Sequence, residues 1–205
     1  MLTKQWVLAE PASSSVLRGY AGMNAVIAQV LYNRGFHDPQ DAARFLYAKE
    51  MPFDPFELDD MSRAVSRIRD AIQHGEKVVV YGDFDADGVT STALLVTALY
   101  KLGANVSPYI PHRVEEGYGL NAEALQEIAR QGAKLVITVD CGIRSVQEVE
   151  DGKAAGLDII VTDHHSLGPE MPDAYAVVNP KRAESNPWML AGVGVAYSLA
   201  YALYR

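Results

Sequence analysis

The chain has 205 residues, of which 49% are hydrophobic and 21% are charged, and its formal net charge is −8. This composition is typical of a soluble globular protein and excludes disordered, collagen-like and low-complexity chains. The negative net charge argues against a protein that grips phosphates mainly through a surface rich in Lys and Arg. We expect one large domain, or one domain with a small appendage.

The sequence carries no export or membrane signal that we can identify. Charged residues, proline and serines interrupt the first 20 residues, and the longest uncharged apolar run, 190–204, is too short to span a membrane. We interpret that run as a buried helix. The single cysteine, Cys141, cannot form an internal disulfide or a cysteine-based zinc site. These features predict a cytoplasmic protein that does not enter a membrane.

Residues 1–75 are predicted to form a small helical amino-terminal region that packs on the core. One helix covers Met23 to Arg34, with a second after Asp38 and a third from about Asp60 to His74. In the first of these helices the apolar residues recur at spacings of three and four, which predicts one buried stripe. The stripe consists of Met23, Val26, Ile27, Val30 and Leu31.

Residues 76–205 alternate short β-branched runs with helical stretches. The predicted strands are 78–81, 106–110, 135–139, 159–162 and 176–178, and the predicted helices are 90–102, 122–131, 145–155 and 193–204. Strands that are apolar on both faces and alternate with helices predict an α/β fold, with a Rossmann-like parallel sheet covered on both sides. In such sheets, ligands bind beyond the carboxyl ends of the strands.

Three of the predicted strands end in acidic residues or histidines. These residues are Asp83, Asp85 and Asp87 after the first strand, Asp140 after the third, and Asp163, His164 and His165 after the fourth. All three clusters should therefore meet at one edge of the sheet. Alternation along an extended chain would place the three aspartates of the first cluster on one side.

Several carboxylates that converge in this way would repel one another unless a cation neutralised them. Carboxylate and imidazole ligands without a thiolate suit Mn²⁺ or Mg²⁺ better than a structural zinc ion. The number of candidate ligands leaves room for two ions. A pair of ions can activate a water molecule for in-line attack on phosphorus, so the residues predict phosphoester hydrolysis.

Each cluster taken alone also has an ordinary structural explanation. An Asp-x-Asp sequence after a strand is often a turn with capping side chains, and a His-His pair is often packed or hydrogen-bonded. The first cluster resembles the start of an EF-hand loop, but Leu94 stands where a bidentate Glu is required. Residues 85–90 also resemble the nucleophile motif of haloacid-dehalogenase-type phosphatases. That minor alternative leaves His164 and His165 unexplained.

Taken together, the motifs resemble those of the DHH phosphoesterase superfamily. The matching segments are 82–88 (GDFDADG), 139–142 (VDCG) and 163–165 (DHH). Residues 116–120 (EGYGL), 179–180 (NP) and 190–196 (LAGVGVA), with 4–8 (KQWVL), narrow the resemblance to the RecJ family of single-stranded-DNA-specific exonucleases. The resemblance covers nearly the whole chain and identifies residues 76–205 as a DHH domain.

This resemblance implies a 5′-to-3′ exonuclease of recombination and repair that depends on Mn²⁺ or Mg²⁺ and acts on single-stranded DNA, with single-strand-binding protein as a further partner. It implies three groups of site residues. The metal ligands are Asp85, Asp87, Asp140, His164 and His165; the catalytic residues are Asp83, Asp163 and His165; and Arg113 could contact a phosphate of the substrate. His165 stands in two groups because it could bind either metal or the scissile phosphate.

The chain also departs from the family pattern. Tyr81 stands where related phosphatases have a histidine ligand, and the family's further aspartate ligand and DNA-binding domains would lie beyond Arg205. We therefore expect this chain to be the amino-terminal part of a longer protein. In isolation, this part could lack activity. Two alternatives stay open: a phosphatase or phosphodiesterase acting on short oligonucleotides, cyclic dinucleotides or pyrophosphate, and a catalytically silent DNA-binding or scaffold module.

Overall fold

The computed structural model describes residues 5, 7–20, 22–47, 54–112, 119–182 and 189–205. The chain divides into two compact units, Met1–Phe53 (unit 1) and Asp54–Arg205 (unit 2). In the part of the chain that is described, no helix is both long enough and apolar enough to span a membrane.

The described residues of unit 1 form three short helices, α1 (Ser14–Arg18), α2 (Ala25–Asn33) and α3 (Pro39–Tyr47). The first two begin where the side chains of Ser13 and Asn24 accept a backbone N–H from the first turn. Their small shared core consists of Tyr20, Ala28, Leu31 and Ala42.

The apolar stripe predicted for α2 was only partly right. Val26, Ile27 and Val30 are 71%, 46% and 44% exposed, whereas Leu31 is buried as predicted. Ala28 and Leu31, one helical turn apart, contact the core of unit 1 instead. The prediction was wrong at the three exposed residues because a core this small covers only a narrow face of a short helix.

Unit 2 is built on a five-stranded parallel sheet, which confirms the predicted α/β fold. Its strands are β1 (Lys77–Gly82), β2 (Asn105–Tyr109), β3 (Ala133–Val139), β4 (Asp158–Thr162) and β5 (Ala176–Val178). Their order in the sheet is β2-β1-β3-β4-β5. Nearly every residue of β1, β3 and β4 is buried, as expected of strands that are covered on both faces.

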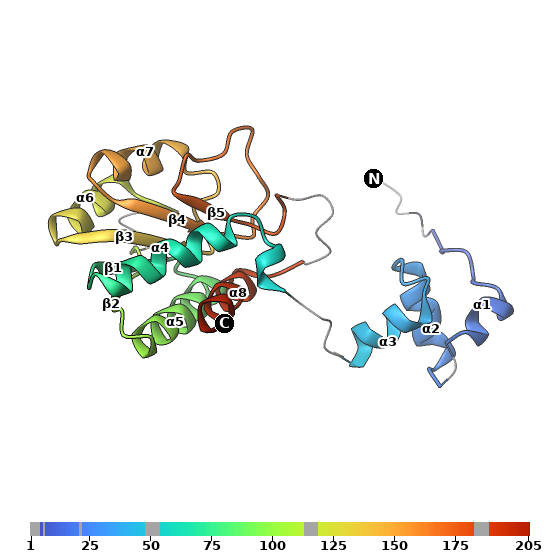
Figure 1. Cartoon of the computed structure of the whole chain (residues 1–205). Helices are drawn as coiled ribbons and strands as arrows, with labels where there is room; N and C mark the ends of the chain where they lie inside the picture. Colours follow the sequence, from blue (N-terminus) through green and yellow to red (C-terminus); the bar gives the residue numbers. More distant parts are fainter. Residues whose placement is uncertain (1–4, 6, 21, 48–53, 113–118, 183–188) are drawn as a thin grey trace. The chain divides into compact units, whose positions relative to one another are not determined.

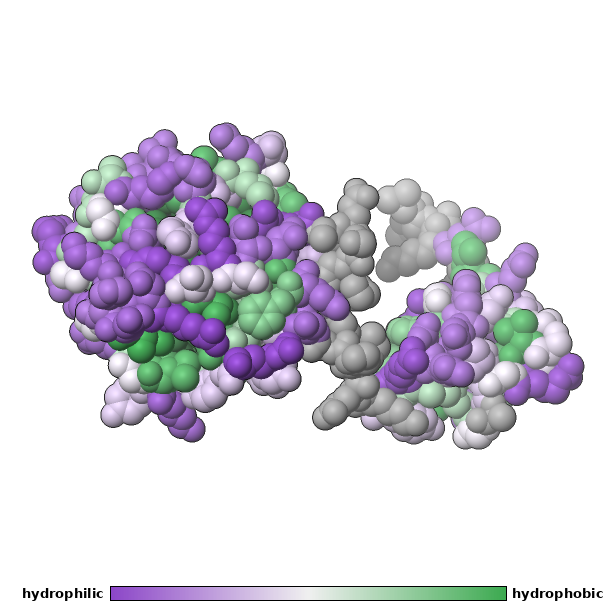
Figure 2. Space-filling model, in the orientation of Figure 1, coloured by the Kyte–Doolittle hydropathy of each residue, from purple (hydrophilic) through white to green (hydrophobic). Residues whose placement is uncertain are grey.

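Helices cover both faces of this sheet (Figure 1). On one face lie α4 (Met61–Gln73), α5 (Ala86–Lys101) and α8 (Gly192–Tyr204), and on the other lie α6 (Ala122–Arg130) and α7 (Val146–Ala154). A short 3-10 helix, η1 (Pro55–Glu57), precedes α4. The face of unit 2 visible in Figure 2 is largely hydrophilic, with smaller hydrophobic patches, as expected of helices that turn only one side to a core.

The predicted domain boundary between residues 75 and 76 falls inside unit 2, because α4 belongs to the same compact unit as the sheet. Arg67 of α4 is buried and donates hydrogen bonds to Asp158 and Glu76, beside the first residues of β4 and β1. At the start of α4, the carboxylate of Asp60 accepts the N–H of Val177 in β5. These contacts hold α4 to the sheet, whereas the periodicity of the sequence shows only that a helix is present.

The strand register brings four polar residues to one edge of the sheet. The last residues of the strands pair in sequence, Gly82 with Val139, Val139 with Thr162, and Thr162 with Val178. The residues that follow immediately are Asp83, Asp140, Asp163 and Asn179. This edge also contains the point between β1 and β3 where the chain changes faces, which is the usual ligand site of open α/β sheets.

Candidate metal centre

The loop after β1 is compact because two glycines allow the backbone to approach closely. A Cβ atom on Gly82 would lie 2.0 Å from Thr92 Oγ1, and one on Gly88 would lie 2.5 Å from the backbone oxygen of Asp83. The first turn of α5 therefore packs directly against the end of β1. This packing keeps Asp83 buried, with a side chain only 3% exposed.

The first aspartate cluster does not follow the alternation of an extended chain, so that part of the prediction was wrong. Asp85 caps α5, and its Oδ1 accepts the N–H groups of Asp87 and Gly88 at 2.8 and 3.0 Å. The helix consequently begins at Ala86, four residues before the predicted start. Asp87 projects from the first helical turn instead of from an extended segment.

Asp87 contacts the amino terminus of α8. Its two carboxylate oxygens accept the N–H groups of Gly192 and Val193, both at 2.7 Å. Ala191 precedes this helix and has no side chain that could cap it. Asp87 supplies that function from a distant part of the sequence, and its negative charge suits the positive end of the helix dipole.

Gly192 also determines how closely α8 approaches the centre. A Cβ atom at this position would lie 2.6 Å from Asp140 Oδ1, so a larger residue would collide with the carboxylate. The LAGVGVA segment entered the sequence analysis only as part of the family resemblance, which does not indicate the group that Gly192 approaches. The structure identifies that group as Asp140.

Asp140 follows β3 in a left-handed backbone conformation, with φ of 62°, which is uncommon for a residue other than glycine. Its side chain is 2% exposed, and its Oδ1 lies 3.1 Å from His164 Nε2. Burial, together with the negative charges of Asp87 and Asp85, raises the pKa of the Asp140 carboxyl to about 7. A strained, buried carboxylate among other acids is the environment that a bound cation would relieve.

The loop after β4 is organised by Asp163, which is 1% exposed. Its Oδ1 accepts the N–H groups of His164 and His165 and lies 2.8 Å from His165 Nδ1, while its Oδ2 accepts the N–H of Ile143. When Nδ1 donates to Asp163, Nε2 is the nitrogen that can act as a ligand. Asp163 thus orients the loop after β4 (residues 163–166), which we call the histidine loop, and supports the site from outside it.

Asn179 holds the same loop from the other side. Its side chain is 1% exposed, its Nδ2 donates to the backbone oxygen of His165 at 3.0 Å, and its Oδ1 accepts the N–H of Lys181. The Asn-Pro pair entered the sequence analysis only as part of the family resemblance. The signal that could have found it is its position directly after the fifth predicted strand.

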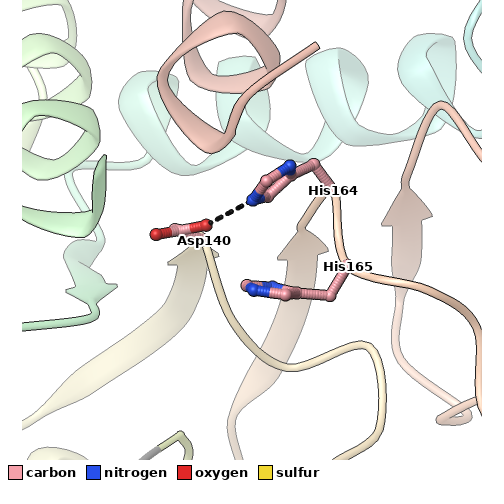
Figure 3. A group of neighbouring side chains, drawn as sticks. All are labelled: Asp140, His164 and His165. Atoms are coloured by element: carbon pink, nitrogen blue, oxygen red, sulfur yellow. Dashed lines mark ion pairs between the residues drawn. The ribbon is translucent and has the colours of Figure 1, made fainter. Parts of the chain in front are cut away.

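Two groups of donor atoms result, and Asp140 belongs to both. Asp83, Asp85 and Asp140 form one group, and Asp140, His164 and His165 form the other, with the ligand atoms of each group within 4.8 Å of one another. Figure 3 shows both imidazoles on the same side of Asp140, with His164 nearest to its carboxylate. The donor set combines carboxylate and imidazole without thiolate, which fits Mn²⁺ or Mg²⁺.

The other predicted site residues lie as follows. Asp87 is in neither group, but its Oδ2 lies 3.6 Å from His164 Nε2, so it borders the second group. Arg113 lies outside the described residues. Tyr81 is fully buried and donates from its hydroxyl to the backbone oxygen of Gly119 at 3.1 Å. The tyrosine therefore supports the neighbouring loop.

Cys141 is a buried residue behind the centre. Its side chain is 1% exposed, and its Sγ lies 3.9 Å from the backbone oxygen of Tyr81. Burial, followed by the charges of nearby aspartates, raises the pKa of the thiol. A neutral, buried thiol is neither a nucleophile nor a metal ligand at neutral pH.

Comparisons with known proteins agree with this geometry. The chain is 46% identical to the single-stranded-DNA-specific exonuclease RecJ of Bacillus subtilis over 204 residues, which cover 97% of this chain and 26% of that protein. The chain thus spans about a quarter of the length of this relative.

The solved structures that resemble the chain include two RecJ exonucleases. One is the exonuclease RecJ bound to manganese, with a TM-score of 0.70 and 40% identity over 75% of this chain and 39% of that chain. The other is RecJ of Thermus thermophilus in complex with Mn²⁺, with a TM-score of 0.77 and 30% identity over 96% of this chain and 28% of that chain.

The model of the DHH family, N-terminal domain, matches residues 77–205, which run from the first residue of β1 to the end of the chain. The matched segment contains the whole sheet and both groups of donor atoms. The chain therefore belongs to the DHH family.

Proposed function

We propose that this chain carries the metal centre of a single-stranded-DNA-specific exonuclease that hydrolyses phosphodiester bonds with Mn²⁺ or Mg²⁺. The observation that carries the proposal is the position of Asp140, which is shared by two groups of donor atoms and has a raised pKa among other acids. The RecJ proteins and structures named above supply the substrate class and the metal.

We assign the following roles to the residues. Asp83, Asp85 and Asp140 would hold one ion, and Asp140 and His164, bordered by Asp87, would hold a second. Such a pair of ions supplies Lewis-acid activation of a water molecule and of the phosphate oxygens when it is bound. The number of ions belongs to the proposal.

The histidine loop supplies orientation and phosphate contact. Asp163 accepts from Nδ1 of His165, so Nε2 is the nitrogen that would contact the metal or the scissile phosphate. Asn179 fixes the backbone of His165, so the imidazole does not have to be ordered when the substrate binds. The residue that caps α5, Asp85, is likewise held in place before any ligand arrives.

The proposal also includes a cytoplasmic location and the partners implied by the family. A buried, unpaired thiol at Cys141 suits a reducing compartment. Single-stranded DNA is the substrate named for the relatives, and single-strand-binding protein is a further partner that we infer from the family resemblance. Co-sedimentation of the chain with a strand coated by that protein tests the last point.

Cleavage of a 5′-labelled single strand in Mn²⁺ tests the proposed activity. We expect the parent chain to release the labelled terminal nucleotide as a mononucleotide and Asp85→Ala to release none. The control is Asp41→Ala, since Asp41 is a half-exposed aspartate of α3, outside unit 2. Equal cleavage by the parent and Asp85→Ala would contradict the proposal, as would a parent chain that neither cleaves the strand nor binds Mn²⁺.

A further inference from the structure

A cavity of about 480 Å³ lies beside the metal centre, on the side of the sheet covered by α6 and α7. Three loops form its walls: the segment before α6, the loop between β3 and α7, and the histidine loop. His165 and Asp163 belong to both the metal centre and the cavity wall. A group bound at the centre would therefore continue directly into this space.

The walls of the cavity are fixed by hydrogen bonds within the protein. Tyr81 donates to the backbone oxygen of Gly119, and the N–H of Ile143 donates to Asp163. Nε of Arg144 donates to the backbone oxygen of Ser166 at 2.9 Å, which joins the second loop to the third. The space is therefore formed before any ligand binds, as is usual for small-molecule sites.

Several polar groups on the wall remain available to a ligand. In the described part of the chain, the terminal nitrogens of Arg144, the hydroxyl of Ser145 and the carboxylate of Glu148 have no hydrogen-bond partner. Ser145 precedes α7 without capping it, so its hydroxyl is not used by its own helix. The cavity thus offers both donors and acceptors a short distance from His165.

These properties fit one nucleotide unit. Ligand sites for small molecules have volumes of roughly 300–1,000 Å³, and this cavity combines polar side chains with an apolar wall contributed by Leu120 and Ile143. Arg144 can donate to sugar or base oxygens, and Glu148 can accept from hydroxyl or amino groups. A free phosphate would fill only the end of the cavity beside His165.

We propose that this cavity binds the terminal nucleoside unit of the substrate strand while its phosphate lies at the metal centre, with Arg144, Ser145 and Glu148 as the contacting residues. The inference rests on the proposed function, since it assigns the cavity to the same substrate. It goes further by naming the residues that distinguish a nucleotide from a bare phosphate ester.

The test compares two probes, thymidine 3′-monophosphate and inorganic phosphate, by calorimetry on the full chain loaded with Mn²⁺. We expect the mononucleotide to bind at least 10-fold more tightly than phosphate. In Ser145→Phe, whose aromatic side chain would fill the cavity, this advantage should disappear while the affinity for phosphate and for Mn²⁺ stays within twofold. Arg144→Gln should reduce the affinity for the mononucleotide about 10-fold.

The matched control is Ser62→Phe, on the exposed surface of α4, which should change neither affinity. Equal binding of the two probes by the parent chain would overturn the inference, as would a mononucleotide advantage that survives in both Ser145→Phe and Arg144→Gln. Because the binding assay needs no turnover, it tests the cavity assignment separately from the proposed exonuclease activity. Loss of Mn²⁺-dependent cleavage counts against the proposed function, whereas loss of the mononucleotide advantage alone counts against the cavity assignment.

Discussion

The two edges of the sheet in unit 2 differ in how their buried charged side chains are compensated. At the amino edge, Arg67 is 8% exposed and lies 2.6 Å from carboxylate oxygens of both Glu76 and Asp158. At the carboxyl edge, no Lys or Arg in the described part of the chain forms an ion pair with Asp85, Asp87 or Asp140. The first edge holds an arginine paired with two carboxylates. At the second edge, backbone N–H groups bind Asp85 and Asp87, but no Lys or Arg in the described residues neutralises the acidic cluster.

Within one sheet, the amino edge therefore contributes to stability and the carboxyl edge contributes to function. Buried ion pairs whose partners are complete are costly to break. Acidic groups without a compensating partner lower the stability of the empty protein but create affinity for a cation. The predictions below test this division, starting with the largest expected effect.

Removal of the buried arginine should have the largest effect on stability. Arg67→Ala removes the two charge-assisted hydrogen bonds of a buried guanidinium to Glu76 and Asp158, and at about 1.5–3 kcal/mol for each bond the loss is about 3–5 kcal/mol. Chemical denaturation of the variant measures this loss. Arg44→Ala, which breaks an exposed pair with Asp41 on α3, is the control and should change the free energy of unfolding by less than about 0.5 kcal/mol. A similar small change in Arg67→Ala would refute the account of the amino edge.

Asp140→Asn should stabilise the metal-free protein. The folded state keeps a proton on Asp140 up to a pH of about 7, whereas the unfolded chain releases it near pH 4. The native state thus binds more protons in this interval, and the free energy of unfolding of the parent falls as pH rises from 4 to 7. Because asparagine does not ionise, the variant does not lose free energy of unfolding over this pH interval. Asparagine also tolerates the left-handed backbone better.

The expected gain for Asp140→Asn at pH 7 is about 2–4 kcal/mol, measured by denaturation in the presence of a chelator. Asp151→Asn on α7, away from the cluster, controls for the general removal of a negative charge. A variant that is less stable than the parent without metal would show that Asp140 is compensated within the protein.

Gly192→Ala should damage the carboxyl edge through steric contact. The added Cβ would lie 2.6 Å from Asp140 Oδ1, so α8 or the carboxylate must move, at a cost of about 1–3 kcal/mol. We expect a roughly 10-fold loss of Mn²⁺ affinity. Gly194→Ala is the control, because its Cβ would meet only the side chain of Leu190, at 3.2 Å. Equal Mn²⁺ affinity in the two variants would remove the steric explanation.

The smallest expected effect concerns Asp60, at the start of α4. Burial opposes its ionisation, but hydrogen bonds from the N–H of Val177 and from Arg182 outweigh burial and lower the pKa of Asp60. The carboxylate therefore stabilises the fold above about pH 4, and this contribution is lost as pH falls through the lowered pKa. Asp60→Asn should cost about 1 kcal/mol at pH 7 and progressively less as the pH falls below about 4. A cost that is independent of pH would contradict this reasoning.

The sheet and the meeting of its three polar strand ends could be predicted because β-branched runs and their flanking residues are local features of the sequence. The start of α5 could not be predicted from alternation, because Asp85 caps the helix and draws Asp87 into its first turn. The partnership of Asp87 with Gly192 joins residues more than a hundred positions apart. No periodicity in the sequence encodes such a contact.

The same limit applies to Arg67 and Asn179. Their residue types are usually exposed, and their burial follows from tertiary packing against the ends of strands. In unit 1, the apolar periodicity of α2 predicted a helix correctly but did not indicate which of its faces would be buried. The local sequence pattern therefore predicted the helices and strands, whereas the partners of the buried polar groups became known only from the structure.

The most direct test of the central claim is the stoichiometry of Mn²⁺ binding, measured by calorimetry. If Asp140 is shared by two groups of ligands, the parent should bind two ions, Asp85→Asn and His164→Gln should each bind one, and Asp140→Asn should bind none. Asparagine at position 85 can still cap α5, so that variant tests the ligand without removing the cap. Unchanged binding of Mn²⁺ by Asp140→Asn would contradict the account.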